Sequence, residues 1–303
     1  MNKNIKNSKS IRIAAALSFA AVAAIGTAYG GVPLNNLQGA GGIAFNPLAY
    51  TAGRPWDAEG CVSNLNGIVS RPQIGAWYVN LNDAGINWWA GGAALTFAER
   101  LEVSAGYGYI NAHKYGDRSI DTYNLGAKLK LLDENAFETA WLPAIAVGGV
   151  YKYTDARTVK AFRLDNDGFD AYIVATKLIT QTPVPILLSA GLLLSDEVVN
   201  GVVGHNDYDV VAFGNIDLLP AENIAIGVEY KQGVNAGHTA ATGGADIRNH
   251  DYWDAHVAWF VNDRLTLVGA FVETGDKDKF VRDGSVKNLG VGSGLVLSAQ
   301  YQF

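Results

Sequence analysis

The chain has 303 residues and carries 29 acidic against 23 basic side chains, a formal net charge of −6. This acidity argues against a nucleic-acid partner, because Lys and Arg bind a phosphate backbone. Cys61 is the only cysteine, which excludes an intrachain disulfide, and 35 glycines among many Tyr and Trp residues argue against a helical bundle.

Residues 1–30 have the layout of a secretory signal peptide. The stretch "MNKNIKNSKSIR" carries four basic side chains and no acid, the apolar block "IAAALSFAAVAAIG" follows, and "TAYGG" supplies small residues. Ala28 and Gly30 fit the positions before a cleavage site. The alternative is an amino-terminal membrane anchor, but the apolar block is shorter than the ~20 residues that a spanning helix needs. The segment predicts export and cleavage before Gly31.

Residues 31–66 differ from the rest of the chain. They are rich in Gly, Asn and Pro and show no regular alternation. Pro33, Pro47 and Pro55 argue against central strands. Three alternatives remain open for this amino-terminal segment: a plug inside a barrel, a periplasmic extension, or an extra strand around residues 41–50.

Residues 67–303 are predicted to be all-β, a transmembrane antiparallel β-barrel of about 12 strands. In "LEVSAGYGYI" (101–110), apolar and small or polar residues alternate, which is typical of a strand with one apolar face. Short and longer polar connections also take turns along the chain, apart from the medium-length connection 133–142, as they do in bacterial outer-membrane barrels. A soluble β-sandwich is the alternative. The predicted strands are approximately 68–80, 86–97, 101–112, 121–132, 143–153, 169–180, 185–195, 208–219, 223–232, 251–261, 264–274 and 290–303.

Aromatic residues gather at the expected strand ends, and the chain itself ends on one. Two aromatic girdles at the two lipid–water interfaces would explain this placement. Tyr301 and Phe303 close the last strand and resemble the carboxy-terminal signal that the outer-membrane barrel assembly machinery reads. We therefore expect a location in the bacterial outer membrane. The expected partners are outer-membrane lipid, lipopolysaccharide and the assembly machinery.

The polar face of each predicted strand should point into the lumen. Charges of both signs there would set a field across a pore for small solutes or small hydrophobic compounds. The alternative is that these charges pair with each other, or with an inserted amino-terminal segment, in a closed structural or partner-binding barrel. The predicted lumen-lining residues are Glu102, Lys128, Lys130, Lys152, Asp209, Asp217, Glu229, Lys231, Asp254 and His256.

Catalytic chemistry finds little support in the sequence. A membrane-embedded hydrolase needs an outward Ser–His pair near the lipid interface, whereas His256 shares the predicted lumen face with Asp254. No G-x-S-x-G motif occurs. The run "DNDGFD" (165–170) lacks the glutamate that an EF-hand requires at its twelfth position. We expect no enzyme, no cofactor and no metal site.

The phrase "GGVPLNNLQGAGGIAFNPLAY" (30–50) carries a family resemblance. With a signal peptide before it and a Phe-ended barrel pattern after it, it resembles a proteobacterial family of uncharacterised outer-membrane β-barrels, a domain of unknown function. The resemblance covers the whole mature chain and implies a location, but no mechanism and no functional residues. In architecture the chain is also similar to small outer-membrane channels, including those linked to uptake of hydrophobic or aromatic compounds.

Overall fold

The computed structural model describes residues 34–53, 68–113, 118–155, 165–203, 208–238, 246–275 and 286–303. The predicted signal peptide and Cys61 lie outside these ranges. Within them, no helix is long and apolar enough to cross a bilayer.

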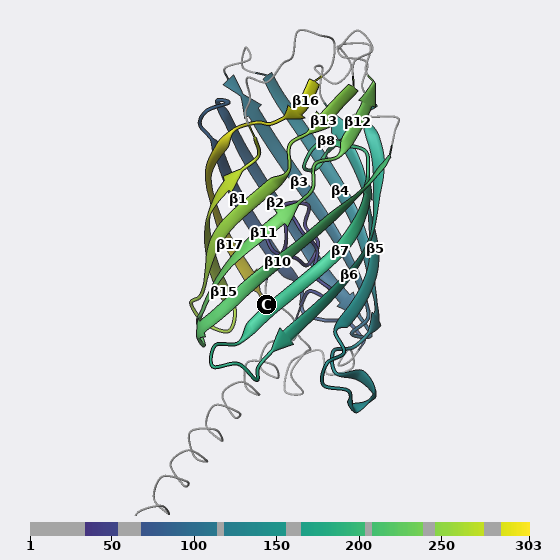
Figure 1. The fold of residues 1–303 in the computed structure, drawn as a ribbon, viewed down its shortest axis with the longest axis vertical. Helices are drawn as coiled ribbons and strands as arrows, with labels where there is room; N and C mark the ends of the chain where they lie inside the picture. Colours follow the sequence, from purple (N-terminus) through teal and green to yellow (C-terminus); the bar gives the residue numbers. More distant parts are fainter. Residues whose placement is uncertain are drawn as a thin grey trace, which may run out of the picture.

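Twelve antiparallel strands form a closed barrel, which confirms the predicted fold class and strand number (Figure 1). Each strand pairs with its sequence neighbour, and β1 pairs with β17 from Gln73↔Gln302 to Asn80↔Leu295 to close the ring. Closure leaves no unpaired edge, which a structure in hydrocarbon requires. The barrel strands are β1 (Gln73–Leu81), β2 (Ile86–Phe97), β3 (Leu101–Ala112), β4 (Arg118–Leu132), β5 (Ala144–Asp155), β6 (Asp167–Ile179), β7 (Ile186–Ser195), β10 (Asp209–Ala221), β11 (Ile224–Lys231), β14 (Tyr252–Phe260), β15 (Leu265–Glu273) and β17 (Ser293–Gln302).

Among the described residues, five further strands lie outside the barrel wall, and none of them was predicted. β8 (Glu197–Val199) and β9 (Val202–Val203) form a hairpin after β7. β12 (Asn235–His238), β13 (Asp246–Asn249) and β16 (Val286–Leu289) form a small sheet. A 3-10 turn, η3 (Ala136–Glu138), lies in the connection between β4 and β5.

The two ends of the barrel differ. The connections 98–100, 180–185, 222–223 and 261–264 are short and share one end with the carboxy-terminus, which we call the turn end. The longer connections lie at the opposite loop end, with two exceptions. The short turn at 82–85 lies at the loop end, and the longer connection 133–143 lies at the turn end.

Each strand has an exposed face that is mainly apolar and a buried face that carries at least one polar side chain, among apolar ones such as Trp77 and Val268. In β11 buried and exposed positions alternate strictly after Ile224, and the exposed ones are Ile226, Val228 and Tyr230. Leu297 on β17 is 59% exposed, whereas its neighbour Ser298 is buried. An apolar outer surface on a closed barrel is the arrangement that contact with lipid demands.

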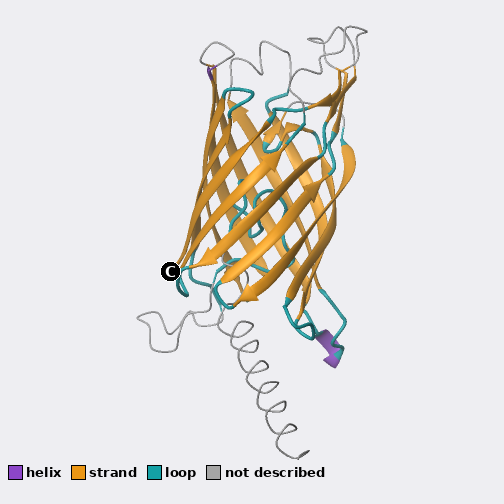
Figure 2. Cartoon of the chain, turned by 60° about the vertical axis from the view of Figure 1, so that its left-hand side comes forward, coloured by secondary structure: helices purple, strands orange, loops and turns teal. Residues whose placement is uncertain are grey.

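Residues 34–53 occupy the inside of the barrel, where Figure 1 draws them in purple and Figure 2 shows them as loops behind the strands. We call this stretch the lumen segment. It forms isolated bridges, Asn35↔Gly41 and Gly42↔Pro47, and none of its residues joins the wall ladder. Its glycines and prolines suit this irregular path and make it a poor strand.

Candidate functional site

The lumen segment is bonded to the wall on all sides. Its hydrogen bonds reach β1, β2, β3, β4, β6, β10, β11 and β17. Asn35 provides one end of this attachment, because its backbone N–H donates to Gln300 Oε1 at 3.1 Å and its carbonyl accepts from Trp77 Nε1 at 2.8 Å. The segment therefore bridges strands that face each other across the barrel.

A buried ion pair on β3 and β4 forms the first charged anchor. Glu102 and Lys128 are directly opposite in the ladder and make a 2.9 Å salt bridge. Glu102 also accepts backbone N–H bonds from Gly41 at 2.8 Å and Ala52 at 2.7 Å, and Lys128 donates to the carbonyls of Gly41 and Tyr50. Removing one partner of such a pair leaves an uncompensated buried charge, at a cost of roughly 3–5 kcal/mol.

Glu229 on β11 forms the second anchor. Its carboxylate accepts three consecutive backbone N–H groups, from Ala44 at 3.1 Å, Phe45 at 3.0 Å and Asn46 at 3.0 Å. Successive amides pointing at one anion form a nest, a backbone concavity that binds negative charge. The polypeptide of the lumen segment thus supplies the donors that this buried carboxylate needs.

A patch of glycines lets the lumen segment touch the wall backbone. Gly39 has φ +91°, and a Cβ there would lie 2.4 Å from the carbonyl oxygen of Ala105. From the wall side, a Cβ on Gly92 would lie 2.4 Å from Gly39 Cα, and one on Gly106 would lie 2.3 Å from the carbonyl oxygen of Gln38. Any side chain at these wall positions would push the segment away.

A carboxylate–imidazole–carboxylate chain crosses three neighbouring strands. His256 on β14 lies 2.7 Å from Asp254 through Nδ1 and 2.7 Å from Asp217 on β10 through Nε2. The intervening β11 position is Gly227, where a Cβ would lie 2.3 Å from Asp217 Oδ1. Because Gly227 leaves this space free, the imidazole reaches across β11. Both ring nitrogens are engaged, as suits a fixed element of the wall.

The connection after β7 folds inward, and its Glu197 joins three wall side chains in a buried charged cluster. We call residues 196–203 the inner loop. Its Glu197 lies 2.7 Å from Lys152 on β5 and is also bonded to Lys231 on β11. Lys152 makes a further ion pair with Asp170 on β6. All four side chains are buried.

The two acids at the start of the inner loop have pKa values that are shifted in opposite directions. Burial raises the pKa of Asp196 to about 6. Burial alone would also raise the pKa of Glu197, but Lys152 and Lys231 outweigh it and hold that pKa well below its usual range.

The predicted lumen residues fall into two groups. Eight of them are buried on the inner face: Glu102, Lys128, Lys152, Asp217, Glu229, Lys231, Asp254 and His256. Lys130 lies at the turn end, half-buried, in a 2.7 Å salt bridge with Asp133. Asp209 lies at the loop end, where it accepts the backbone N–H groups of Val210 and Asn235.

Sequence reasoning missed the two acids of the cluster that surrounds Lys152 and Lys231. Asp170 occurs in a stretch that is apolar on both sides, so its facing was uncertain. Glu197 occurs in a connection without periodicity, where no local pattern indicates an inward side chain. The only available signal was an acidic pair, "DE" (196–197), directly after a strand.

One family description matches most of the chain. The family described as "Protein of unknown function (DUF3034)" matches residues 30–283. The chain belongs to the DUF3034 family. This match confirms the resemblance noted from the amino-terminal phrase. No curated protein matches this DUF3034 chain.

Several solved structures are similar to this DUF3034 barrel at low sequence identity. The outer membrane protein Omp33 of Acinetobacter baumannii is 12% identical, with a TM-score of 0.43 over 78% of this chain and 100% of that one. The NanC porin is 8% identical, with a TM-score of 0.44 over 77% of this chain and 98% of that one. OmpF of Salmonella typhi, in complex with daunomycin, is 9% identical, with a TM-score of 0.31 over 78% of this chain and 97% of that one.

Proposed function

We propose that the protein lies in the outer membrane of a Gram-negative bacterium, after export through a cleaved signal peptide, and forms a channel for small solutes that the lumen segment holds closed. Lipid and lipopolysaccharide would then surround the apolar outer face. Tyr301 and Phe303, whose rings meet edge to face at 5.1 Å, would serve the assembly machinery. We expect no enzymatic role, since both ring nitrogens of His256 are bonded to carboxylates inside the barrel.

The observation that carries this proposal is the way in which the wall charges are satisfied. Glu102, Lys128 and Glu229 bond to backbone groups of the lumen segment. A barrel of twelve strands is wider than the eight-stranded barrels that side chains fill on their own. If the segment moves away, a wide lumen remains, and its wall carries the charged side chains together with apolar ones such as Trp77 and Val268. The charged part of this wall favours small water-soluble solutes.

Replacing one wall glycine with a larger residue tests whether the lumen segment closes the channel. Gly106→Val puts a side chain where a Cβ already meets the Gln38 carbonyl oxygen at 2.3 Å, so the segment should be displaced. We expect stepwise currents in planar lipid bilayers from this variant and little or no current from the wild type. The matched control is Gly269→Val on β15, where a Cβ meets nothing within 4 Å.

Two outcomes would contradict the proposal. A folded Gly106→Val barrel that conducts no ions would mean that the lumen is not a path, and would favour the structural or partner-binding barrel. Equal, large currents from the wild type and both variants would mean that the segment does not close it.

A further inference from the structure

Glu197 places its carboxylate between two lysines of the barrel wall. One oxygen of Glu197 lies 2.7 Å from Lys152 Nζ and accepts the Gly201 N–H at 2.9 Å, and the other accepts from Lys231 Nζ. The two lysines come from β5 and β11, between which β6, β7 and β10 intervene. Both ammonium groups converge on one carboxylate from separate parts of the wall, the arrangement that gives strong charge-assisted hydrogen bonds.

The wall alone has an excess of positive charge at this point. Lys152 is also paired with Asp170, so the two lysines share only one wall carboxylate. Lys231 has its remaining contacts with Asn200 Oδ1 at 2.8 Å and the Tyr252 ring at 5.4 Å, and neither carries a negative charge. The second negative charge comes from the inner loop. A loop that moved aside would leave an anion site facing the lumen.

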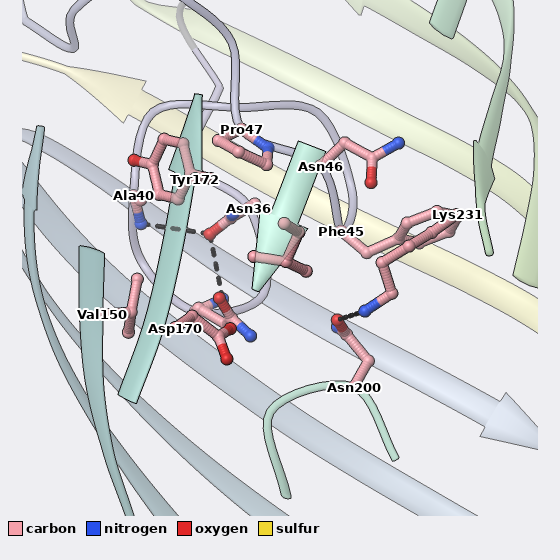
Figure 3. Close-up of a pocket in the computed structure, with 12 residues that line it drawn as sticks. Asn36, Ala40, Phe45, Asn46, Pro47, Val150, Asp170, Tyr172, Asn200 and Lys231 are labelled. Atoms are coloured by element: carbon pink, nitrogen blue, oxygen red, sulfur yellow. Dashed lines mark hydrogen bonds between the residues drawn. The ribbon is translucent and has the colours of Figure 1, made fainter. Parts of the chain in front are cut away.

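A small cavity of about 10 Å³ adjoins this cluster, between the inner loop and the lumen segment. Figure 3 shows Lys231 and Asn200 on one side of it, Asp170 and Tyr172 on the wall, and Phe45 of the lumen segment. The volume suits about one water molecule while the loop is in place.

Several buried polar atoms that line this cavity have no hydrogen-bond partner among the described residues. They are Asp170 Oδ1, Asn46 Oδ1 and Asn200 Nδ2, and all three side chains are more than nine-tenths buried. Buried polar atoms without partners are costly, so such atoms beside a cavity indicate a place for a polar ligand. The two oxygens are acceptors and call for hydroxyl donors, whereas Phe45 and Tyr172 offer apolar surface.

We propose that Lys152 and Lys231 form a binding site for the carboxylate of a small hydroxylated organic acid, and that Glu197 fills this site in the closed protein. The acid's carboxylate takes the place of the Glu197 side chain. Its hydroxyl groups donate to Asp170 on the wall and to Asn46 of the lumen segment, because only the inner loop moves when the acid binds. The inference rests on the proposed channel function and names the class of solute that such a channel would admit from the loop end.

Binding of gluconate to the full-length protein in detergent tests the site directly by calorimetry. Glu197→Gln removes the competing charge and keeps the shape of the side chain, so it should bind gluconate at least about tenfold more tightly than the wild type, as expected for charge-assisted hydrogen bonds. Adding Lys231→Gln to Glu197→Gln should abolish that gain. The matched control is Glu222→Gln, which removes an exposed turn carboxylate and should bind like the wild type.

Four results would overturn the site. They are equal gluconate affinity of the wild type and Glu197→Gln, undiminished binding after Lys231→Gln, equal binding of the neutral analogue sorbitol, and tighter binding of inorganic phosphate than of gluconate. If Glu197→Gln does not give a folded barrel, Glu197→Asp replaces it. Its shorter side chain cannot span both lysines, so its gluconate affinity should exceed that of the wild type, and an unchanged affinity would contradict the proposal.

The calorimetry also separates this inference from the proposed channel. Gluconate binding by a protein whose Gly106→Val variant carries no current would support the site and contradict the channel. Current through Gly106→Val without gluconate binding by Glu197→Gln would support the channel and contradict the site.

Discussion

Two adjacent acids at the start of the inner loop have opposite electrostatic surroundings. Glu197 lies between two ammonium groups, which keep it charged. Asp196 is equally buried, and its Oδ1 has no partner among the described residues. Ionisation of Glu197 therefore holds the inner loop in the lumen, whereas ionisation of Asp196 opposes that position.

The inner loop should loosen as the pH rises. Burial raises the pKa of Asp196 to about 6, against about 3.9 for an exposed Asp. The folded loop thus favours the protonated acid, and its stability is full below about pH 4, falls progressively as the pH rises through about 6, and levels off above that. Glu197, whose pKa is lowered, stays charged throughout this range.

Hydrogen exchange at the Gly201 amide, which donates to Glu197, reports this loosening. The ratio of the wild-type exchange rate to that of Asp196→Asn at the same pH cancels the intrinsic pH dependence. We expect the ratio to rise about tenfold or more between pH 4 and pH 8, since one unit of pKa shift corresponds to a factor of ten. A ratio that stays constant across this range would contradict the assigned role of Asp196.

At the residue scale, the sequence predicts which way a side chain faces better than it predicts what the side chain bonds. Period-two alternation indicates the inward side of Glu102 and Glu229, because successive side chains in a strand point to opposite faces. It cannot show that their partners are backbone amides of residues 41–52, since that contact depends on the path of a segment without periodicity. Lys130 and Asp209 lie near strand ends, where long side chains turn toward connections.

At the scale of one element, β14 shows how a single strand presents polar side chains to the lumen and apolar ones to the outside of the barrel. In "YWDAHVAWF" the buried positions carry Asp254 and His256, and the exposed ones carry Trp253, Val257 and Trp259. Trp253 lies near the loop end and Trp259 near the turn end, with Val257 between them. This order, aromatic, aliphatic, aromatic, is the pattern of a lipid-facing strand with an interface at each end.

Val257→Arg should destabilise the folded barrel by roughly 2–4 kcal/mol, the cost of a guanidinium near the bilayer midplane. Val257 is 46% exposed and lies opposite Ile226 and Gly269, so the new side chain would point outward from the middle of three strands. The free energy of unfolding from liposomes in urea measures the effect. The matched control is Val261→Arg just after β14, where the interface should reduce the cost to about 0–1 kcal/mol. Equal costs at the two positions would refute the lipid-facing assignment.

The strands that sequence alone could predict are those that run the length of the wall. Their ten-residue alternation is long enough to read, and the predicted range 101–112 agrees with β3 (Leu101–Ala112). The hairpin of β8 and β9 has strands of three and two residues, too short to show a period. Its place is set by the salt bridges of Glu197 with distant lysines.

At the scale of the whole molecule, the lumen segment connects opposite parts of the barrel wall. A closed barrel without contents would leave Glu102, Lys128 and Glu229 without the backbone partners that they now bond. The segment joins β3 and β4 on one side to β11 on the other, so the two anchors are linked through only a few residues of chain. We infer that they act together.

If the lumen segment binds as one unit, weakening one anchor should expose the other. In a Cys61→Ser background, cysteine reporters at Ala44, which bonds Glu229, and at Ala52, which bonds Glu102, allow thiol labelling at each anchor. We expect Glu102→Gln to speed labelling at position 44, and Glu229→Gln to speed it at position 52, each by about tenfold or more. Each substitution weakens hydrogen bonds to a charged group worth roughly 1.5–3 kcal/mol apiece. Glu222→Gln, on an exposed turn, should change neither rate. Faster labelling only beside the substituted residue would mean that the anchors open independently, and a segment that opens piecewise could not act as a single closure of the lumen.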